Sequence, residues 1–74
     1  MVWFFAREAE LLRIEATHDA SGASVLTIYR KDGATQRETF TSEAACHLRL
    51  EQLEQQLRAD AWTLRIVAPL RAER

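Results

Sequence analysis

The chain has 74 residues, an apolar content of 47% and a net charge of −1, which indicate one ordered domain over residues 1–74 rather than a disordered chain. A charge this close to zero argues against a protein built wholly for binding nucleic acid or acidic membranes. The single cysteine excludes an internal disulfide, which small secreted domains usually need, so we expect a cytoplasmic protein. Residues 1–5 are apolar but too few for a membrane span or a signal segment, so we expect no membrane association.

The N-terminal part of the chain is interpreted as two strands joined by a turn. Residues 3–5 form a short aromatic run, which we take as the first strand. Residues 6–16 contain good helix formers, but their second half alternates apolar and polar residues as a half-buried strand does. We expect a turn at residues 7–9 and a second strand at residues 10–18, because a helix there would leave the aromatic run without a partner.

Residues 24–30 and 35–40 are expected to be the third and fourth strands, joined by a loop that contains the hairpin signal Asp-Gly. A three-residue loop with Gly33 in the left-handed conformation places Phe40 on the same face as Leu26. A two-residue loop places Phe40 on the opposite face. Burying the apolar side chains together favours the three-residue loop.

Residues 41–60 have the periodicity of a long helix with one buried side. The apolar stripe consists of Cys46, Leu50, Leu53 and Leu57. A hydroxyl at Thr41 or Ser42 can cap the start of this helix, and Asp60 is the expected exit residue.

Ala44 and Leu48 lie on another side of the predicted helix from the apolar stripe. One interpretation is a solitary exposed leucine, which is normal on any protein surface. The other is a second helix surface at which two copies of the chain meet.

Residues 62–67 alternate apolar and polar side chains, which indicates a last strand, and Pro69 cannot continue a ladder. Residues 68–74 are expected to be a frayed tail. The predicted fold class is therefore α+β: an antiparallel four-stranded meander, one long helix on its apolar face, and a C-terminal fifth strand. The predicted core contains Leu12, Ile14, Leu26, Ile28, Phe40, Leu50, Leu53, Leu57, Trp62, Leu64 and Ile66, with one N-terminal aromatic residue.

The sequence gives little support for catalysis. Cys46 and His47 look like a nucleophile and its base, but adjacent helix residues diverge by about 100°, so their side chains do not face each other. A metal site would need His18, His47 and Cys46 to converge, and their spacing matches no metal-binding pattern. We therefore expect no catalytic residues, no metal and no cofactor.

One face of the predicted sheet is basic. If the apolar strand residues point toward the helix, the opposite face carries threonines together with Arg13, Tyr29, Lys31, Arg37 and Arg65. Such a face suits a surface that follows phosphates and stacks a base. The other interpretation is an ordinary solvated sheet face, because these residue types are common on exposed strands.

The order of four strands followed by a helix is similar to that of the positive-coactivator-4 and Whirly types of single-stranded DNA-binding fold. The resemblance is one of architecture and covers the first sixty residues. No motif matches residue by residue, so no site is carried over from those folds, and a fold-level likeness is weak evidence for function.

The short chain has one small core, which rarely supplies more than about 3–5 kcal/mol, and folds of this size often gain stability by oligomerising. We therefore expect a small non-enzymatic interaction module that forms a homodimer. Leu48 and the aromatic N-terminus, which one helix is not expected to cover, support the same expectation. Either aligned sheet edges or the surface of Ala44 and Leu48 would meet across a two-fold axis. A different protein is the other partner that we consider. The alternative function is single-stranded nucleic-acid binding on the basic face.

Overall fold

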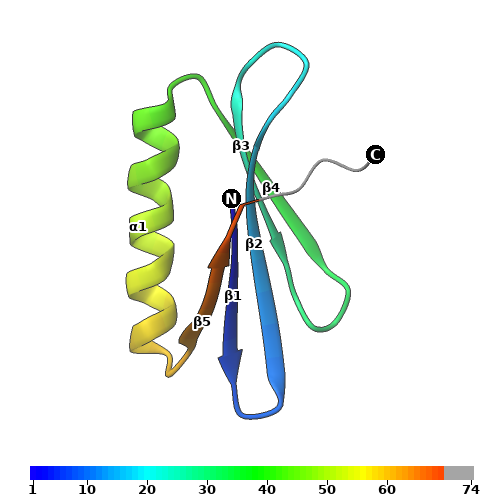
Figure 1. The fold of residues 1–74 in the computed structure, drawn as a ribbon, viewed down its shortest axis with the longest axis vertical. Helices are drawn as coiled ribbons and strands as arrows, with labels where there is room; N and C mark the ends of the chain where they lie inside the picture. Colours follow the sequence, from blue (N-terminus) through cyan, green and yellow to red (C-terminus); the bar gives the residue numbers. More distant parts are fainter. Residues whose placement is uncertain (70–74) are drawn as a thin grey trace.

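The computed structural model describes residues 1–69, which form five strands and one helix (Figure 1). The strands are β1 (Val2–Arg7), β2 (Glu10–His18), β3 (Ser24–Tyr29), β4 (Thr35–Phe40) and β5 (Thr63–Ala68), and the helix α1 (Glu43–Ala59) lies between β4 and β5 in the chain. The strands form one antiparallel sheet in the order β4-β3-β2-β1-β5. This confirms the predicted α+β fold.

The C-terminal strand has the predicted length but is shifted by one residue, because it begins at Thr63 and Ala68 still pairs with Val2 of β1. The rest of the predicted tail, residues 70–74, lies outside the described residues. We call the sheet face that α1 covers the inner face and the opposite one the outer face.

The stretch that fitted both a helix and a strand is a strand. Leu12 and Ile14 of β2 are buried on the inner face, opposite Phe5 and Trp3 of β1. The two strands are joined by a tight turn at residues 8–9, with a φ of 54° at Glu8. A second helix here would have left the inner face of β1 without this partner.

The β3–β4 hairpin has the predicted three-residue loop. The Arg30 N–H donates to the Ala34 carbonyl at 3.0 Å, and Gly33 has a φ of 87°. Glycine adopts this conformation without the steric cost that a side chain would add. Phe40 therefore lies on the same face as Leu26, as the side-chain parity predicted.

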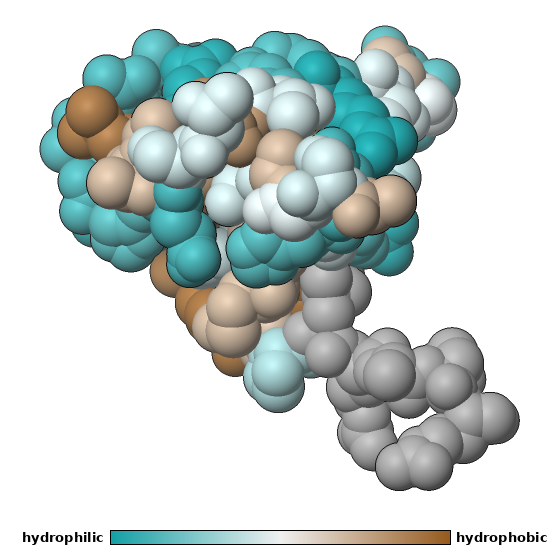
Figure 2. Space-filling view, turned by 90° about the horizontal axis from the view of Figure 1, so that it is seen from above, coloured by the Kyte–Doolittle hydropathy of each residue, from teal (hydrophilic) through white to brown (hydrophobic). Residues whose placement is uncertain are grey.

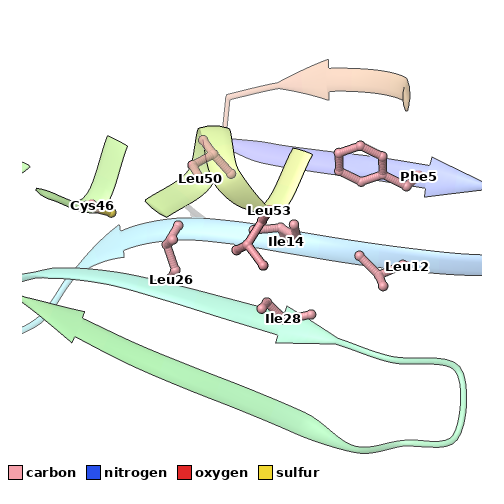
Figure 3. Packing of buried hydrophobic residues seen from close by; sticks show 8 residues of the cluster. All are labelled: Phe5, Leu12, Ile14, Leu26, Ile28, Cys46, Leu50 and Leu53. Carbon is pink, nitrogen blue, oxygen red and sulfur yellow. The ribbon is translucent and has the colours of Figure 1, made fainter. Parts of the chain in front are cut away.

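The core lies between α1 and the inner face of the sheet (Figure 3). Its buried cluster contains Phe5, Leu12, Ile14, Leu26, Ile28, Cys46, Leu50 and Leu53. Partly buried residues surround it, namely Trp3, Ala16, Phe40, Leu57, Trp62 and Leu64. The predicted core is therefore confirmed except for Ile66, whose residue surface is 55% exposed.

The prediction for Ile66 is wrong because β5 shifts register against β1. Phe5 is opposite Leu64, whereas Phe4 is opposite Ile66, so Arg65 is an extra residue on β5. One extra residue reverses the side-chain parity of all that follows. Ile66 consequently lies on the outer face, and Val67 lies on the inner face opposite Trp3.

The helix begins with the predicted cap at Ser42 and ends at the predicted exit residue Asp60, but the left-handed position falls one residue later. The Ser42 hydroxyl accepts from the Ala45 N–H at 3.1 Å. At the other end Asp60 has a φ of −98°, and the left-handed residue is Ala61, with a φ of 69°. The Trp62 N–H donates to the Leu57 carbonyl at 2.8 Å, which completes a Schellman motif.

Arg7 holds this helix exit against the end of β1. Its guanidinium donates to the Asp60 carboxylate at 2.9 Å and to the Asp60 carbonyl at 3.2 Å. It also bonds the Glu10 carboxylate at 2.9 Å and lies 4.6 Å from the centre of the Trp62 ring. These contacts join the first hairpin, the helix exit and the start of β5.

The ion pair between Glu38 and Arg49 holds the first half of α1 over β4. Arg49 donates to Glu38 at 2.9 Å and 3.2 Å through two nitrogens. The hydrogen bond from Arg49 lowers the pKa of Glu38, and a second one from Gln36 acts in the same direction. The helix therefore begins on the β4 side of the sheet and ends beside β1 and β5.

Ala61→Gly is expected to raise the free energy of unfolding by about 1 kcal/mol, because a left-handed φ strains any residue that has a Cβ. Ala59→Gly is the control, since Ala59 is helical and glycine there should lower stability by roughly 0.5–1 kcal/mol. Urea denaturation followed by circular dichroism measures both. Equal destabilisation by the two changes would contradict the strain at residue 61.

Acid is expected to weaken the link between α1 and β4. Because the pKa of Glu38 is lower in the folded protein, the unfolded chain binds more protons, and stability falls as the pH drops below about 4.5. In the Glu38→Gln variant, the free energy of unfolding that is lost on acidification should be smaller by about 0.5–1 kcal/mol. Glu8→Gln, at an exposed turn position, is the control and should keep the loss unchanged. Urea midpoints measured from pH 7 downward test this.

Candidate functional site

The helix crosses the sheet obliquely and leaves one corner of the inner face uncovered. It starts next to the end of β4 and finishes next to the start of β5 (Figure 1). Within the sheet it contacts mainly β3 and β4. The start of β1 and the end of β5 meet where Trp3 is opposite Val67, and this corner lies beside the first half of α1.

A cavity of about 850 Å³ opens at this corner. Its sheet side contains Met1, Trp3, Ala16 and Leu26, and its helix side contains Ala44, Cys46, Leu48 and Leu50. Charged and titratable side chains surround it, namely His18, Glu43, His47 and Glu51. We call Met1, Trp3, Ala44, Leu48 and Val67 the open corner. The cavity is thus lined mainly by apolar side chains, with charged and titratable ones at its border.

Large apolar side chains at the open corner are unusually exposed. Leu48 is 57% exposed, Met1 47% and Val67 46%. Figure 2, a view from above, shows hydrophobic atoms at its left and lower sides among atoms of intermediate and hydrophilic character. Met1 and Leu48 line the cavity, and Val67 lies opposite Trp3 beside it. Several exposed apolar residues close together are typical of a binding surface, whereas a single one is not.

The structure places both predicted helix residues, Ala44 and Leu48, at this cavity. The sequence indicated uncovered apolar area at the aromatic N-terminus, but it did not place Met1, Trp3 and Val67 on one surface with the two helix residues. The apolar start of the chain was a signal for the first two. The position of Val67 depends on the register shift at Arg65, which no local pattern revealed.

Cys46 at the bottom of the cavity is a buried free thiol. Burial raises its pKa, and the nearby charges of Glu43 and Glu38 raise it further. A thiol in this state is a poor nucleophile. His47 is at the border instead, where its Nε2 lies 3.7 Å from the Glu51 carboxylate. The position of Cys46 in the buried apolar stripe of the helix therefore agrees with its surroundings.

Within residues 1–69 no three potential metal ligands lie together. No helix in the same part of the chain is long and apolar enough to cross a membrane.

The predicted basic residues are not gathered into one groove. Arg13, Tyr29 and Arg37 lie on the outer face over β2, β3 and β4. Lys31 is in the β3–β4 loop, and Arg65 is at the register shift of β5, on the other edge of the sheet. The five residues therefore span the width of the sheet.

Arg13 and Tyr29 are engaged with each other and with an acid. The Arg13 guanidinium lies 4.1 Å from the centre of the Tyr29 ring. Its Nε is 3.2 Å from the Glu15 carboxylate, and the Tyr29 hydroxyl donates to Glu15 at 3.4 Å. One face of the ring is thus occupied, and part of the positive charge is balanced within the chain.

Apolar side chains separate Arg65 from the other basic residues on the outer face. Phe4 is opposite Arg13 on one side and Ile66 on the other. Leu11 is 64% exposed next to them. An apolar area that contains Phe4, Leu11 and Ile66 therefore lies between Arg65 and the basic residues of β2 to β4 on the outer face.

The chain matches no model of a protein family, no curated protein and no solved structure. The function proposed below consequently rests on the geometry of the chain itself.

The nucleic-acid alternative makes a separate prediction. The fluorescence anisotropy of a labelled single-stranded oligonucleotide should rise when the protein is added at low salt. Arg37→Glu combined with Arg65→Glu should abolish this rise, because each change replaces a positive charge by a negative one that repels phosphate. Glu43→Gln, on the helix and away from the outer face, is the control. An unchanged signal in the double variant, or none with the wild type, would contradict the alternative.

Proposed function

We propose that this chain is a small non-enzymatic interaction module that self-associates as a homodimer and needs no cofactor. The open corner carries the proposal, because Met1 and Leu48 line its apolar cavity while about half exposed, and the similarly exposed Val67 lies opposite Trp3 of the same cavity. A monomer of this size has little apolar area to bury, so leaving this surface in water is costly. A second copy offers the same surface by symmetry.

The energetic scale of this association is moderate. Burying a large apolar side chain fully contributes roughly 1.5–3 kcal/mol, so a half-exposed one contributes about 1 kcal/mol. Two-fold symmetry counts Met1, Leu48 and Val67 twice, which gives about 6 kcal/mol in total. The loss of rotational and translational freedom opposes association by at least about 4 kcal/mol. Stable dimerisation therefore needs further contacts besides these side chains.

The titratable groups with shifted pKa values have structural roles, which supports a non-enzymatic protein. The Asp19 carboxylate accepts from the Ser21 hydroxyl and from backbone N–H groups of its own turn, and these bonds lower its pKa. Glu38 and Arg49 are paired across the helix–sheet interface. None of these three side chains borders the cavity at the open corner, and Cys46, which does, is a buried thiol whose pKa is raised by burial. A cytoplasmic location belongs to the same proposal, because Cys46 is a free thiol.

Leu48→Glu is expected to shift the protein from dimer to monomer, because it places a charge in the apolar contact. Gln56→Glu adds the same charge at another exposed helix position, on the side of α1 that Arg49 occupies, and should leave the dimer intact. Light scattering over a range of concentrations measures the mass of each variant, and circular dichroism verifies folding.

A wild-type protein that stays monomeric at high micromolar concentration would end the proposal. A Leu48→Glu variant that remains dimeric would show that the dimer interface is not at the open corner.

A further inference from the structure

The two edges of the sheet differ in chemistry. Edge strand β4 carries polar side chains that bond to one another, since Gln36 donates to Glu38 at 2.8 Å and accepts from Arg30 at 3.3 Å. Edge strand β5 exposes Ile66 by 55% and Val67 by 46%. Polar and charged residues protect an edge from pairing, whereas an exposed apolar edge is a template for another strand.

We propose that two copies of the chain pair antiparallel along β5, about a two-fold axis perpendicular to the sheet, so that their sheets become continuous. This inference rests on the proposed self-association and names its interface. The backbone hydrogen bonds of the new ladder supply the contacts that the side chains of the open corner lack.

The topology makes the two copies complementary in this arrangement. In one copy the start of β5 lies beside the last turn of α1, and the end of β5 lies beside the start of β1 (Figure 1). Trp3 and Val67 of the open corner are at this second end. Antiparallel pairing places the start of the second β5 next to the end of the first. The last turns of the second helix therefore approach the open corner of the first copy, and symmetry repeats this contact at the other corner.

The register shift in β5 suits this pairing. Because of the extra residue Arg65, consecutive residues Ile66 and Val67 lie on the outer and the inner face. The new ladder therefore has apolar contacts on both of its faces. On the inner face Val67 extends the surface of Trp3, and on the outer face Ile66 extends that of Phe4.

The charges at the contact are also complementary. Glu43 and Glu51 border the cavity, and their side chains are 78% and 56% exposed. The helix end that approaches from the second copy carries Arg58, whose side chain is 66% exposed. Its partner within the chain, Glu54, is 3.8 Å away, which is a weak surface pair. Arg58 of one copy can therefore pair with the acidic border of the other.

Cysteine cross-linking tests the interface directly. The residue that lies on the two-fold axis is opposite the same residue of the second copy. Single variants are therefore oxidised separately and run on a non-reducing gel, namely Arg65→Cys, Ile66→Cys and Val67→Cys. At least one of them should form a covalent dimer. Arg37→Cys at the β4 edge is the control, and the wild type gives the background from buried Cys46.

A second measurement does not depend on oxidation. Ile66→Lys should weaken dimerisation by about tenfold or more, which is about 1.4 kcal/mol. Leu11→Lys makes the same kind of change on the outer face, at a residue that is 64% exposed and two strands from the edge, and should leave dimerisation unchanged. Both positions are exposed, so both variants should fold.

The outcomes separate this inference from the proposal on which it rests. A dimer by light scattering that gives no cross-link on β5 and tolerates Ile66→Lys would overturn the β5 interface and leave self-association standing. A cross-link through Arg37→Cys in place of the β5 variants would overturn it as well. A monomeric wild type would overturn both proposals. The partner of the β5 edge would then be an extended segment of a different protein.

Discussion

One helix has to cover a five-stranded sheet, and this mismatch shapes the whole molecule. A helix with its side chains is about 10 Å wide, whereas the outer strands of five, spaced about 4.8 Å apart, lie about 19 Å from each other. The helix can therefore protect only a diagonal band of the inner face. The Glu38–Arg49 pair sets one end of that band, and Arg7 with Asp60 sets the other. The open corner is the area that this band leaves.

The same constraint explains why the interior and the candidate site are adjacent. Leu26 and Leu50 belong to the buried core, yet both also line the cavity at the open corner. The surface that we propose for self-association is thus an extension of the core, without a polar layer between them. A partner that fills the cavity would complete the core of each copy, so association and folding stability are expected to be linked.

Local patterns predicted most of the fold because each depended on neighbouring residues. The helix stripe, the Ser42 cap and the three-residue loop at Gly33 follow from spacing, hydrogen-bonding capacity and side-chain parity within a few positions. The same reasoning identified Leu48 as a surface residue outside the stripe. These predictions did not require knowledge of which strands lie side by side.

The features that the sequence did not reveal depend on distant partners. The register shift at Arg65 exists only because β5 has to match β1, so the alternation of its own residues misplaced Ile66. The left-handed residue at the helix exit is Ala61 rather than Asp60, and the contact of Arg7 with the exit lies 53 positions away in the chain. The extent of the open corner depends likewise on the direction in which α1 crosses the sheet.

The position of β5 also has a consequence for how the chain folds. Its ladder with β1 joins residues about 60 positions apart, and closing a loop of this length costs roughly 2 kcal/mol more entropy than closing a short hairpin. The meander can therefore assemble first, with β1 as a temporary border until the last strand arrives. During that interval the edge of β1 at Trp3, Phe4 and Phe5 is unpaired, and the β5 strand of another molecule can pair with it. Exchange of this strand between copies is accordingly the characteristic misassembly of such a topology.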